Sequence, residues 1–336
     1  MALSVRDFLH VQLFLDIPKP TASFSGKTII ITGANSGLGK EAAKHIVALS
    51  ASKVILACRS VSSGKAAKLE IETALKCRTD VLEVWELDLE SDISVKAFAN
   101  RVNHLPQLDV LINNAGISAE KFSLVYGTER TLGVNVIGTF LLSLLVLPKL
   151  RETAKKFNTT PHMTFVGSAM HSTANYPKKF DGDFFTWSCE KENVNLNNQY
   201  ALSKYIQLLL VNKLASHIDP LPSTTSKESN KIIINSLDPC FCGTTGLFRD
   251  VSGGKRIFLK IFNLFSRTPE KGSRLIVGAA AAGRETHGGW LRAGEVRETV
   301  EMVRGVEGVE RGERVWRDLV GRVEGLGVGV GGLVEG

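Results

Sequence analysis

The chain has few of the residues that build metal centres and disulfide frameworks. Its 336 residues include an odd number of cysteines, scattered along the chain: Cys58, Cys77, Cys189, Cys240 and Cys242. No CxxC pair and no HExxH motif occurs, so the sequence predicts neither a zinc site nor a disulfide framework. We therefore expect a reducing, cytoplasmic location and no bound metal.

The sequence also lacks the marks of a nucleic-acid-binding protein. It carries 41 Lys and Arg against 34 Asp and Glu, a net charge of +7, but no basic cluster interleaved with aromatic residues. This excess of positive charge suits an anionic ligand such as a phosphorylated cofactor, and we expect no nucleic-acid partner. A hydrophobic fraction of 43% with 22% charged residues fits one ordinary α/β domain with extensions.

The apolar N-terminal segment is too short to span a membrane. Residues 8–20 (FLHVQLFLDIPKP) are interrupted by Asp16 and do not follow the pattern of a signal peptide. We expect this segment to pack across the outer surface of the sheet. Loose contact with a membrane surface is the minor alternative.

Short β-branched runs alternate with helical patterns along most of the chain. Strands are predicted near residues 28–32, 53–57, 81–87, 109–113, 163–167, 231–237 and 289–292. Helices are predicted near residues 37–49, 62–76, 93–102, 126–150, 198–217 and 269–282. This alternation predicts an α/β fold: a Rossmann-type, doubly wound parallel sheet that binds ligands at the carboxyl ends of its strands.

A glycine-rich turn follows the first predicted strand and opens the first predicted helix. Residues 27–32 are rich in β-branched side chains, and Gly33, Gly37 and Gly39 come directly after them. Glycines at these places let the backbone approach a pyrophosphate, whose charge the N-terminus of the helix stabilises. The order of strand, glycine turn and helix therefore indicates a dinucleotide site.

Tyr200 and Lys204 stand four residues apart in a segment with a helical pattern. Residues at i and i+4 lie on one helix face, so the phenol and the ammonium would share one space. A nearby cation favours the phenolate, which predicts a lowered pKa for Tyr200 and proton exchange with a substrate oxygen near neutral pH. The spacing alone is more typical of an exposed helix face, so this inference depends on the rest of the chain.

Taken together, these motifs resemble those of the single-domain short-chain dehydrogenase/reductase family over roughly residues 26–292. Residues 32–39 (TGANSGLG) match the family's TGxxxGxG turn, and residues 113–116 match its NNAG segment. The family's catalytic tetrad is matched, in the expected order, by Asn135, Ser168, Tyr200 and Lys204. Within the family, the chain is most similar to retinol-dehydrogenase-like reductases, and it is also similar to fungal members that tailor secondary metabolites.

The resemblance implies a role for each member of the tetrad. Ser168 would donate a hydrogen bond to the substrate oxygen, and Tyr200 would supply the proton. Lys204 would lower the pKa of Tyr200 and bond the nicotinamide ribose. Asn135 would support a water chain that returns protons from solvent to Lys204. The cofactor itself would carry the hydride.

The resemblance also implies which residues hold the cofactor. The glycine turn, the ends of later strands and the catalytic helix contribute Thr32, Gly33, Asn35, Ser36, Gly37, Leu38, Gly39, Asp88, Leu89, Asn114, Ala115, Gly116, Tyr200, Lys204, Pro239 and Thr244. Of these, Asp88 and Leu89 would line the adenine pocket, and Thr244 would contact the pyrophosphate or the nicotinamide amide.

The residue after the second predicted strand indicates which dinucleotide is bound. NAD-binding folds place an acid about 20 residues after the glycine turn, where it holds the ribose 2′-hydroxyl. This chain has no acid there and carries Arg59 instead. A guanidinium pairs with a 2′-phosphate, and Lys40 would add positive charge. We therefore predict NADP(H) as the cofactor.

The chain departs from the family pattern in two places. Ser168 and Tyr200 are 32 positions apart (200 − 168), against roughly a dozen in the family, and the loop between them is rich in aromatic residues. Its aromatic side chains, which we expect to shape the substrate site, are Tyr176, Phe180, Phe184, Phe185 and Trp187. Cys240 stands where the family has glycine, so we expect a reshaped loop there.

Three further segments lie outside the motif-bearing core. Residues 255–267 combine helical spacing with a broad apolar face and are predicted to form a lid, which favours a hydrophobic small-molecule ketone, aldehyde or alcohol. Residues 220–230 are predicted to be a polar surface insertion. The glycine-rich residues 324–336 are expected to be disordered. Residues 296–323 have a charged, helix-like pattern, but their four glycines do not let the sequence decide whether they form a helix.

The predicted organisation is therefore an N-terminal extension (1–25), a dinucleotide-binding catalytic domain (26–295) and a C-terminal tail (296–336). The function favoured is NADPH-dependent reduction of a carbonyl, or the reverse oxidation of an alcohol. Two alternatives stay open: an NADP-binding regulatory or scaffold protein with impaired catalysis, and a redox-neutral epimerase or dehydratase. Family members often pair through helices near residues 125–150 and 199–217, which makes a homodimer the candidate assembly.

Overall fold

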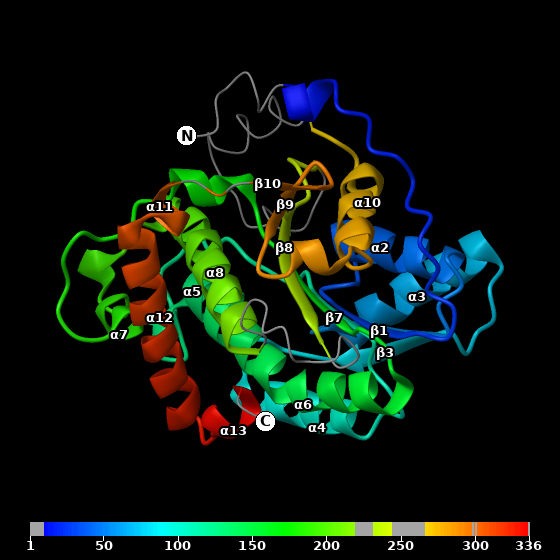
Figure 1. The fold of residues 1–336 in the computed structure, drawn as a ribbon, viewed down its shortest axis with the longest axis horizontal. Helices are drawn as coiled ribbons and strands as arrows, with labels where there is room; N and C mark the ends of the chain where they lie inside the picture. Colours follow the sequence, from blue (N-terminus) through cyan, green and yellow to red (C-terminus); the bar gives the residue numbers. More distant parts are fainter. Residues whose placement is uncertain (1–9, 219–230, 244–265, 298, 300, 335–336) are drawn as a thin grey trace.

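The computed structural model describes residues 10–218, 231–243, 266–297, 299 and 301–334. Its centre is an eight-stranded sheet of order β10-β9-β8-β7-β4-β1-β2-β3 (Figure 1). The strands are β1 (Thr28–Thr32), β2 (Lys53–Cys58), β3 (Leu82–Glu86), β4 (Val110–Asn113), β7 (His162–Val166), β8 (Ile233–Asp238), β9 (Trp290–Arg292) and β10 (Glu295–Arg297). Neighbouring strands run parallel except β10, which is antiparallel to β9. The predicted parallel sheet is confirmed, with β10 as an edge strand that was not predicted.

Helices cover both faces of the sheet. They are α2 (Gly37–Ala48), α3 (Val61–Leu75) and α10 (Pro269–Ala279) on one face, and α4 (Asp92–Asn103), α6 (Thr139–Phe157) and α8 (Leu196–Ile218) on the other (Figure 1). Successive side chains of a strand point to opposite faces. Accordingly Ile30 joins the core beneath α4, α6 and α8, while Ile29 and Ile31 join the core beneath α2 and α10. Burial on both faces explains the continuous apolar runs in the sequence.

The helix predicted near residues 126–150 begins later than expected. Residues 124–129 form a hairpin of β5 (Leu124–Val125) and β6 (Thr128–Glu129), and Tyr126 and Gly127 turn it with φ of 55° and 68°. Two left-handed residues in a row are what a tight two-residue hairpin turn requires. Helical structure starts with α5 (Arg130–Leu132) and continues through the π-helix η1 (Gly133–Gly138) into α6.

The most apolar 18-residue window of this continuous helix, Arg130–Phe157, has a mean hydropathy of 1.9, so the helix could cross a membrane by length and composition alone. However, 89% of its most apolar window is buried inside the protein. It is therefore a helix of the protein core.

The C-terminal tail is ordered over residues 301–334, so the prediction of disorder for the glycine-rich stretch is wrong there. The segment forms α11 (Glu301–Arg304), α12 (Val306–Gly325) and α13 (Gly331–Val334). Valines between the glycines enter the core, with Val328, Val330 and Val334 all buried. The guanidinium of Arg151 donates to the carbonyls of Leu333 (2.5 Å) and Val334 (2.6 Å), so these two carbonyls at the end of α13 have hydrogen-bond partners. Long-range packing thus orders a segment of low sequence complexity.

The two last helices lie on the surfaces through which pairing was expected. Helix α12 packs along α8, and α13 packs against both α6 and α8. The buried side chains on the inner face of α12 include Val315, Leu319 and Val323. A homodimer that used the same faces of α6 and α8 would first have to displace these helices.

The N-terminal segment packs on α10 and on the loop after β8 and does not lie directly on the sheet. Gln12 Nε2 donates to the carbonyl of Phe241 at 2.7 Å, and Ile17 is buried. The guanidinium of Arg274 in α10 donates to the carbonyl of Ile17 at 2.6 Å. The predicted surface insertion (220–230), residues 255–265 of the predicted lid, and Thr244 lie outside the described residues.

Candidate active site

The glycine turn has the geometry expected of an anion cradle. Gly33 and Gly37 adopt φ of 65° and 56°, a region that side-chain-bearing residues rarely occupy. A Cβ at Gly39 would lie 2.5 Å from Asn114 Nδ2, so only glycine fits there. Ser36 precedes α2 with no side-chain hydrogen bond to the helix, and the first turn of α2 carries no acid. The N–H groups that open α2 are therefore suited to bind a pyrophosphate.

Thr32 has a structural role that the sequence alone did not indicate. Its side chain is buried, and its hydroxyl accepts hydrogen bonds from the N–H groups of Asn114 (3.0 Å) and Ala115 (2.9 Å). Asn114 Nδ2 in turn donates to the carbonyl of Thr32 at 2.8 Å. Thr32 thus ties the glycine turn after β1 to the NNAG segment after β4.

The structure brings the tetrad together at the carboxyl ends of β4 and β7. Ser168 follows β7 and caps the short 3₁₀-helix η2 (Ala169–Thr173), and its side chain lies near enough to Tyr200 to lower the pKa of the phenol. Tyr200 and Lys204 lie one turn apart on α8, with Lys204 Nζ 5.9 Å from the centroid of the Tyr200 ring. The ammonium donates to the carbonyl of Val166, the last residue of β7, at 2.7 Å. Ser168, which follows β7, and Tyr200 and Lys204, which lie on α8, are thereby held close together at the carboxyl end of β7.

Asn135 lies in the π-helix η1, with its side chain pinned to the backbone of Ile117. Asn135 Oδ1 accepts from the N–H of Ile117 at 2.8 Å, and its Nδ2 donates to the carbonyl of Ile117 at 2.9 Å. A single-turn π-helix inside an α-helix is frequent at functional sites. Both ends of the Asn135 amide are therefore engaged by protein groups.

Gln207 joins this network, and the sequence analysis missed it. Its Oε1 accepts from Lys204 Nζ at 3.2 Å, and its Nε2 donates to the carbonyl of Asn135 at 3.3 Å. Gln207 thus bridges Asn135 and Lys204 directly, at the place where a water chain was expected. Its position three residues after Lys204, on the same helix face, was the available signal.

The pKa of Tyr200 shifts in the direction opposite to the expected one. The pKa of Tyr200 is raised to about 12, chiefly by burial; the Ser168 side chain opposes the rise and the Asp238 carboxylate adds to it. Burial also lowers the pKa of Lys204 to about 8. Desolvation penalises the charged form of both groups and outweighs their mutual attraction. Tyr200 is consequently a protonated phenol at neutral pH, the form that donates a proton.

Comparison with known proteins identifies the family. The short chain dehydrogenase profile matches residues 27–160. The chain is 39% identical to the short chain dehydrogenase/reductase dmxR8 of Cryptosporiopsis sp. over 96% of this chain and 98% of the relative. It is 36% identical to the short-chain dehydrogenase anuD of Penicillium roqueforti over 99% of this chain and 87% of the relative. The chain belongs to the short-chain dehydrogenase/reductase family.

The fold agrees with this assignment. A short chain dehydrogenase from Shigella flexneri, solved in complex with NADP, matches with a TM-score of 0.59 at 19% identity. The match covers 82% of this chain and 100% of that structure. The predicted family and fold class are therefore confirmed, as is the similarity to fungal members.

Arg59 is the residue predicted to pair with the 2′-phosphate of the cofactor. Arg59 comes directly after β2, and its side chain is 63% exposed with an ion pair to Glu90 at 3.2 Å. Glu90 is also held by Arg130 at 2.7 Å, so the acid is neutralised without Arg59. Lys40 is paired with Glu70 at 2.6 Å. Compared with Lys40 and Arg130, Arg59 has the longer ion pair, so its side chain can reorient toward a phosphate at a smaller loss of free energy.

The two residues expected at the adenine differ in exposure. Asp88 is half-buried, and its Oδ1 accepts from the N–H of Glu90 at 3.0 Å. Leu89 is part of the hydrophobic core, and its carbonyl accepts from the hydroxyl of Tyr126 at 3.0 Å. Gly116, expected to pack against the cofactor, lies close to Asn135: a Cβ added at Gly116 would be 3.3 Å from Asn135 Oδ1.

Cys240, in the loop after β8, adopts a left-handed conformation with φ of 66°, which glycine takes more readily than other residues. The expected reshaping of the loop stays a prediction. This conformation costs a side-chain-bearing residue on the order of 1 kcal/mol. Burial raises the pKa of the Cys240 and Cys242 thiols to about 12 each, so both are neutral packing groups.

The aromatic loop between Ser168 and Tyr200 packs into the main hydrophobic core beneath α4, α6 and α8, and a role of its rings in shaping the substrate site stays a prediction. The Tyr176 ring lies 5.5 Å from that of Phe184 and 5.9 Å from that of Tyr205 on α8, measured between centroids. The guanidinium of Arg314 on α12 lies 3.7 Å from the Phe180 ring. The long insertion is thus held against α8 by the C-terminal helix.

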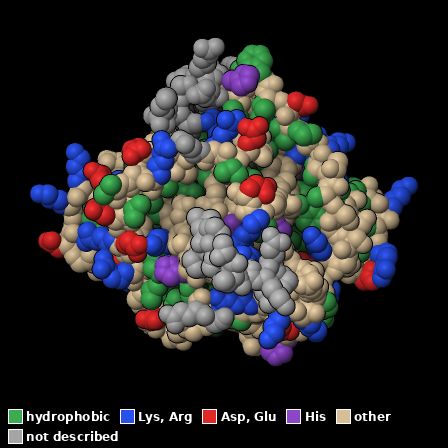
Figure 2. All heavy atoms as spheres, viewed as in Figure 1, with side chains coloured by type: hydrophobic (Ala, Val, Ile, Leu, Met, Phe, Trp, Pro, Cys, Tyr) green, Lys and Arg blue, Asp and Glu red, His purple; other side chains and the backbone are tan. Residues whose placement is uncertain are grey.

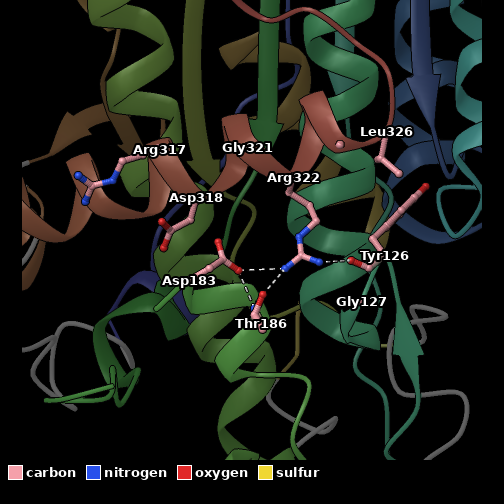
Figure 3. Close-up of a pocket in the computed structure, with 10 residues that line it drawn as sticks. Tyr126, Gly127, Asp183, Thr186, Arg317, Asp318, Gly321, Arg322 and Leu326 are labelled. Atoms are coloured by element: carbon pink, nitrogen blue, oxygen red, sulfur yellow. Dashed lines mark hydrogen bonds and ion pairs between the residues drawn. The ribbon is translucent and has the colours of Figure 1, made fainter. Parts of the chain in front are cut away.

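A surface groove of about 590 Å³ separates α12 from this loop (Figure 3). Arg322 crosses its floor and donates to Asp183 Oδ1 at 2.9 Å, Thr186 Oγ1 at 2.8 Å and the carbonyl of Tyr126 at 3.3 Å. None of the tetrad residues lines this groove. On the face of the molecule shown in Figure 2, basic and acidic side chains are interspersed over the surface.

Proposed function

We propose that the protein uses NADPH to reduce a ketone or aldehyde on a hydrophobic small molecule, or catalyses the reverse oxidation. The observation that carries this proposal is the convergence of Ser168, Tyr200 and Lys204 at the end of β7, on the same carboxyl edge of the sheet as a glycine turn shaped for a pyrophosphate. Tyr200 is a proton donor at neutral pH, which suits reduction.

The bound cofactor would supply the hydride, and the chain's residues would do the rest. Ser168 would donate a hydrogen bond to the substrate oxygen and orient the carbonyl. Tyr200 would pass its proton to that oxygen as negative charge develops on it. Lys204, fixed by the Val166 carbonyl and by Gln207, would hold the ribose of the cofactor and favour the phenolate left behind.

We further propose a preference for NADPH over NADH. The position after β2 carries Arg59 instead of an acid, and its exposed side chain can reach a 2′-phosphate. The similar structure from Shigella flexneri was solved with NADP, which agrees with this choice. We also propose a small-molecule substrate. The scattered cysteines favour a cytoplasmic location, and the lack of a basic cluster interleaved with aromatic residues favours no nucleic-acid partner.

The test is to incubate the purified protein and NADPH with a panel of apolar ketones and aldehydes and to follow NADPH absorbance. Carbonyl-dependent loss of NADPH, with alcohol formed in equal amount, is the expected result. NADPH binding without consumption would favour the regulatory or scaffold alternative. Product formation without net consumption of NADPH would favour the redox-neutral epimerase or dehydratase.

A further inference from the structure

The N-terminal segment, residues 10–17, is bonded to the loop after β8, residues 239–243, by a buried side chain. Gln12 is only 4% exposed, and its Nε2 donates to the carbonyl of Phe241 at 2.7 Å. Its Oε1 accepts from the N–H of the same Phe241 at 3.1 Å. One amide thus pairs with both backbone groups of one residue, as a neighbouring strand would. Because unpaired buried polar groups are costly, this pairing fixes where the loop lies.

The same segment also holds the chain that leads into α10 (Figure 1). Arg267 pairs with the loop through its backbone: its N–H donates to the carbonyl of Phe241 at 2.9 Å, and its carbonyl accepts from the N–H of Gly243 at 3.1 Å. The guanidinium of this buried arginine donates to the carbonyls of Val11 (2.6 Å) and Leu15 (2.5 Å). Charge-assisted bonds are the stronger ones, so Arg267 is a second anchor between the segment and the loop.

The loop lies beside the glycine turn, with α10 between them. A Cβ added at Gly272 of α10 would be 2.8 Å from Leu38 Cδ2 and 2.9 Å from the carbonyl oxygen of Pro239, and it would overlap Cys242 Sγ. Leu38 belongs to the glycine turn, whereas Pro239 and Cys242 belong to the loop. Only glycine therefore lets α10 approach both at once. The loop that the N-terminal segment holds is next to the turn expected to bind the pyrophosphate.

We propose that residues 10–17 are a working part of the cofactor site: through Gln12 and Arg267 they hold the loop after β8 in the position that receives the nicotinamide end of the dinucleotide. Gln12 and Arg267 are positioning residues, since they act through the loop. The role in cofactor binding rests on the function proposed above. The hold on the loop does not, because it is a property of the protein alone.

The first test uses the two buried thiols of the loop as reporters and needs no ligand. Cys240 and Cys242 are 9% and 7% exposed, so they should react with an alkylating reagent chiefly when the loop opens. Gln12→Met keeps the length of the side chain but removes both hydrogen bonds. Mass spectrometry should then show alkylation of the two thiols at least about 5-fold faster than in the wild type.

Two controls separate local opening from general loss of stability. Cys58 is 3% exposed at the end of β2, and its alkylation in Gln12→Met should stay at the wild-type rate. Phe14→Ala changes the same N-terminal segment at a side chain that is 75% exposed, and it should leave the alkylation of all three thiols unchanged. Unchanged alkylation of the loop thiols in Gln12→Met, or an equal acceleration at Cys58, would overturn the proposal.

The second test compares the binding of NADPH with that of adenosine 2′,5′-bisphosphate, which has the adenosine end but no nicotinamide. Calorimetry should show NADPH bound about 3- to 10-fold more weakly by Gln12→Met, because the loop is in its binding position for a smaller fraction of the time. Arg267→Met, which removes the other anchor, should act in the same direction. Neither variant should change the affinity for adenosine 2′,5′-bisphosphate.

Equal losses for the two nucleotides, or an unchanged affinity for NADPH, would overturn the role in cofactor binding. A wild-type protein that binds neither nucleotide would overturn that role together with the function proposed above. The alkylation rates would still decide whether the N-terminal segment holds the loop, so the two failures are distinct.

Discussion

The cofactor half of the molecule and its C-terminal half are built in different ways. In the first, each feature of the site follows a strand within a few residues, as Gly33 follows β1, Arg59 follows β2 and Asn114 follows β4. In the second, the aromatic loop is held by α12, which comes more than a hundred positions later. The first half is specified by local motifs, and the second by contacts between segments distant in sequence. Chemistry and stability should therefore respond separately to substitution in the two halves.

The largest expected effect is on chemistry, from Tyr200→Phe. Loss of the proton donor should lower kcat by about 10²–10⁴-fold, with NADPH affinity and melting temperature nearly unchanged. Tyr205→Phe is the control, because Tyr205 lies on the same helix but donates to the carbonyl of Met302 at 2.6 Å. It should reduce stability modestly and leave kcat intact. Near-normal turnover in Tyr200→Phe would remove the basis for the catalytic assignment.

Next in size is an effect on stability, from Leu319→Ala on α12. Leu319 is fully buried in the core shared with α8, so its truncation should cost about 2–5 kcal/mol in the free energy of unfolding. Val309→Ala on the same helix, at a side chain that is 54% exposed, should cost little. Urea unfolding of both variants measures the difference. If the two variants were equally stable, α12 would not be part of the folded core.

Arg59→Asp should reveal the cofactor preference. Replacing the guanidinium by an acid removes a charge-assisted contact to the 2′-phosphate and adds repulsion. The ratio of kcat/KM for NADPH to that for NADH should fall at least roughly 10-fold. Arg101→Asp is a control on α4, since Arg101 is also exposed but lies over the Trp85 ring at 3.7 Å. A wild-type preference for NADH would contradict the prediction outright.

The smallest effect should come from Gln207→Leu, which removes an acceptor from Lys204. The charged form of Lys204, whose pKa is already lowered to about 8, would lose a partner that favours it. Its pKa should fall further, so the alkaline limb of the pH–activity profile should move to lower pH. Gln199→Leu, a buried glutamine one turn before Ser203 on the same helix, controls for the loss of an amide. An alkaline limb that stays in place would show that Gln207 does not act through Lys204.

Much of the fold and the main site residues could be predicted from the sequence because they depend on short-range patterns. The Ile-rich strand β1, the glycine turn after it and the Tyr200–Lys204 spacing each report local structure. The order of the tail could not be predicted, since Val328 and Val330 gain their burial from distant helices. The pKa of Tyr200 was misjudged for a related reason: desolvation depends on how many atoms the fold packs around the phenol, which the spacing to Lys204 does not reveal.

The π-turn that carries Asn135 has a consequence for how this chain tolerates length changes. A π-turn contains one residue more than an α-turn, so deleting a single residue from Gly133–Gly138 would restore regular α-helical hydrogen bonding. The helix would become more regular, and the flanking turns would keep their orientation because the π-turn absorbs the extra residue locally. The residues within the turn would shift, so the paired amide of Asn135 would lose its place. Point substitutions at the helix surface should be accepted far more readily than a change of one residue in its length.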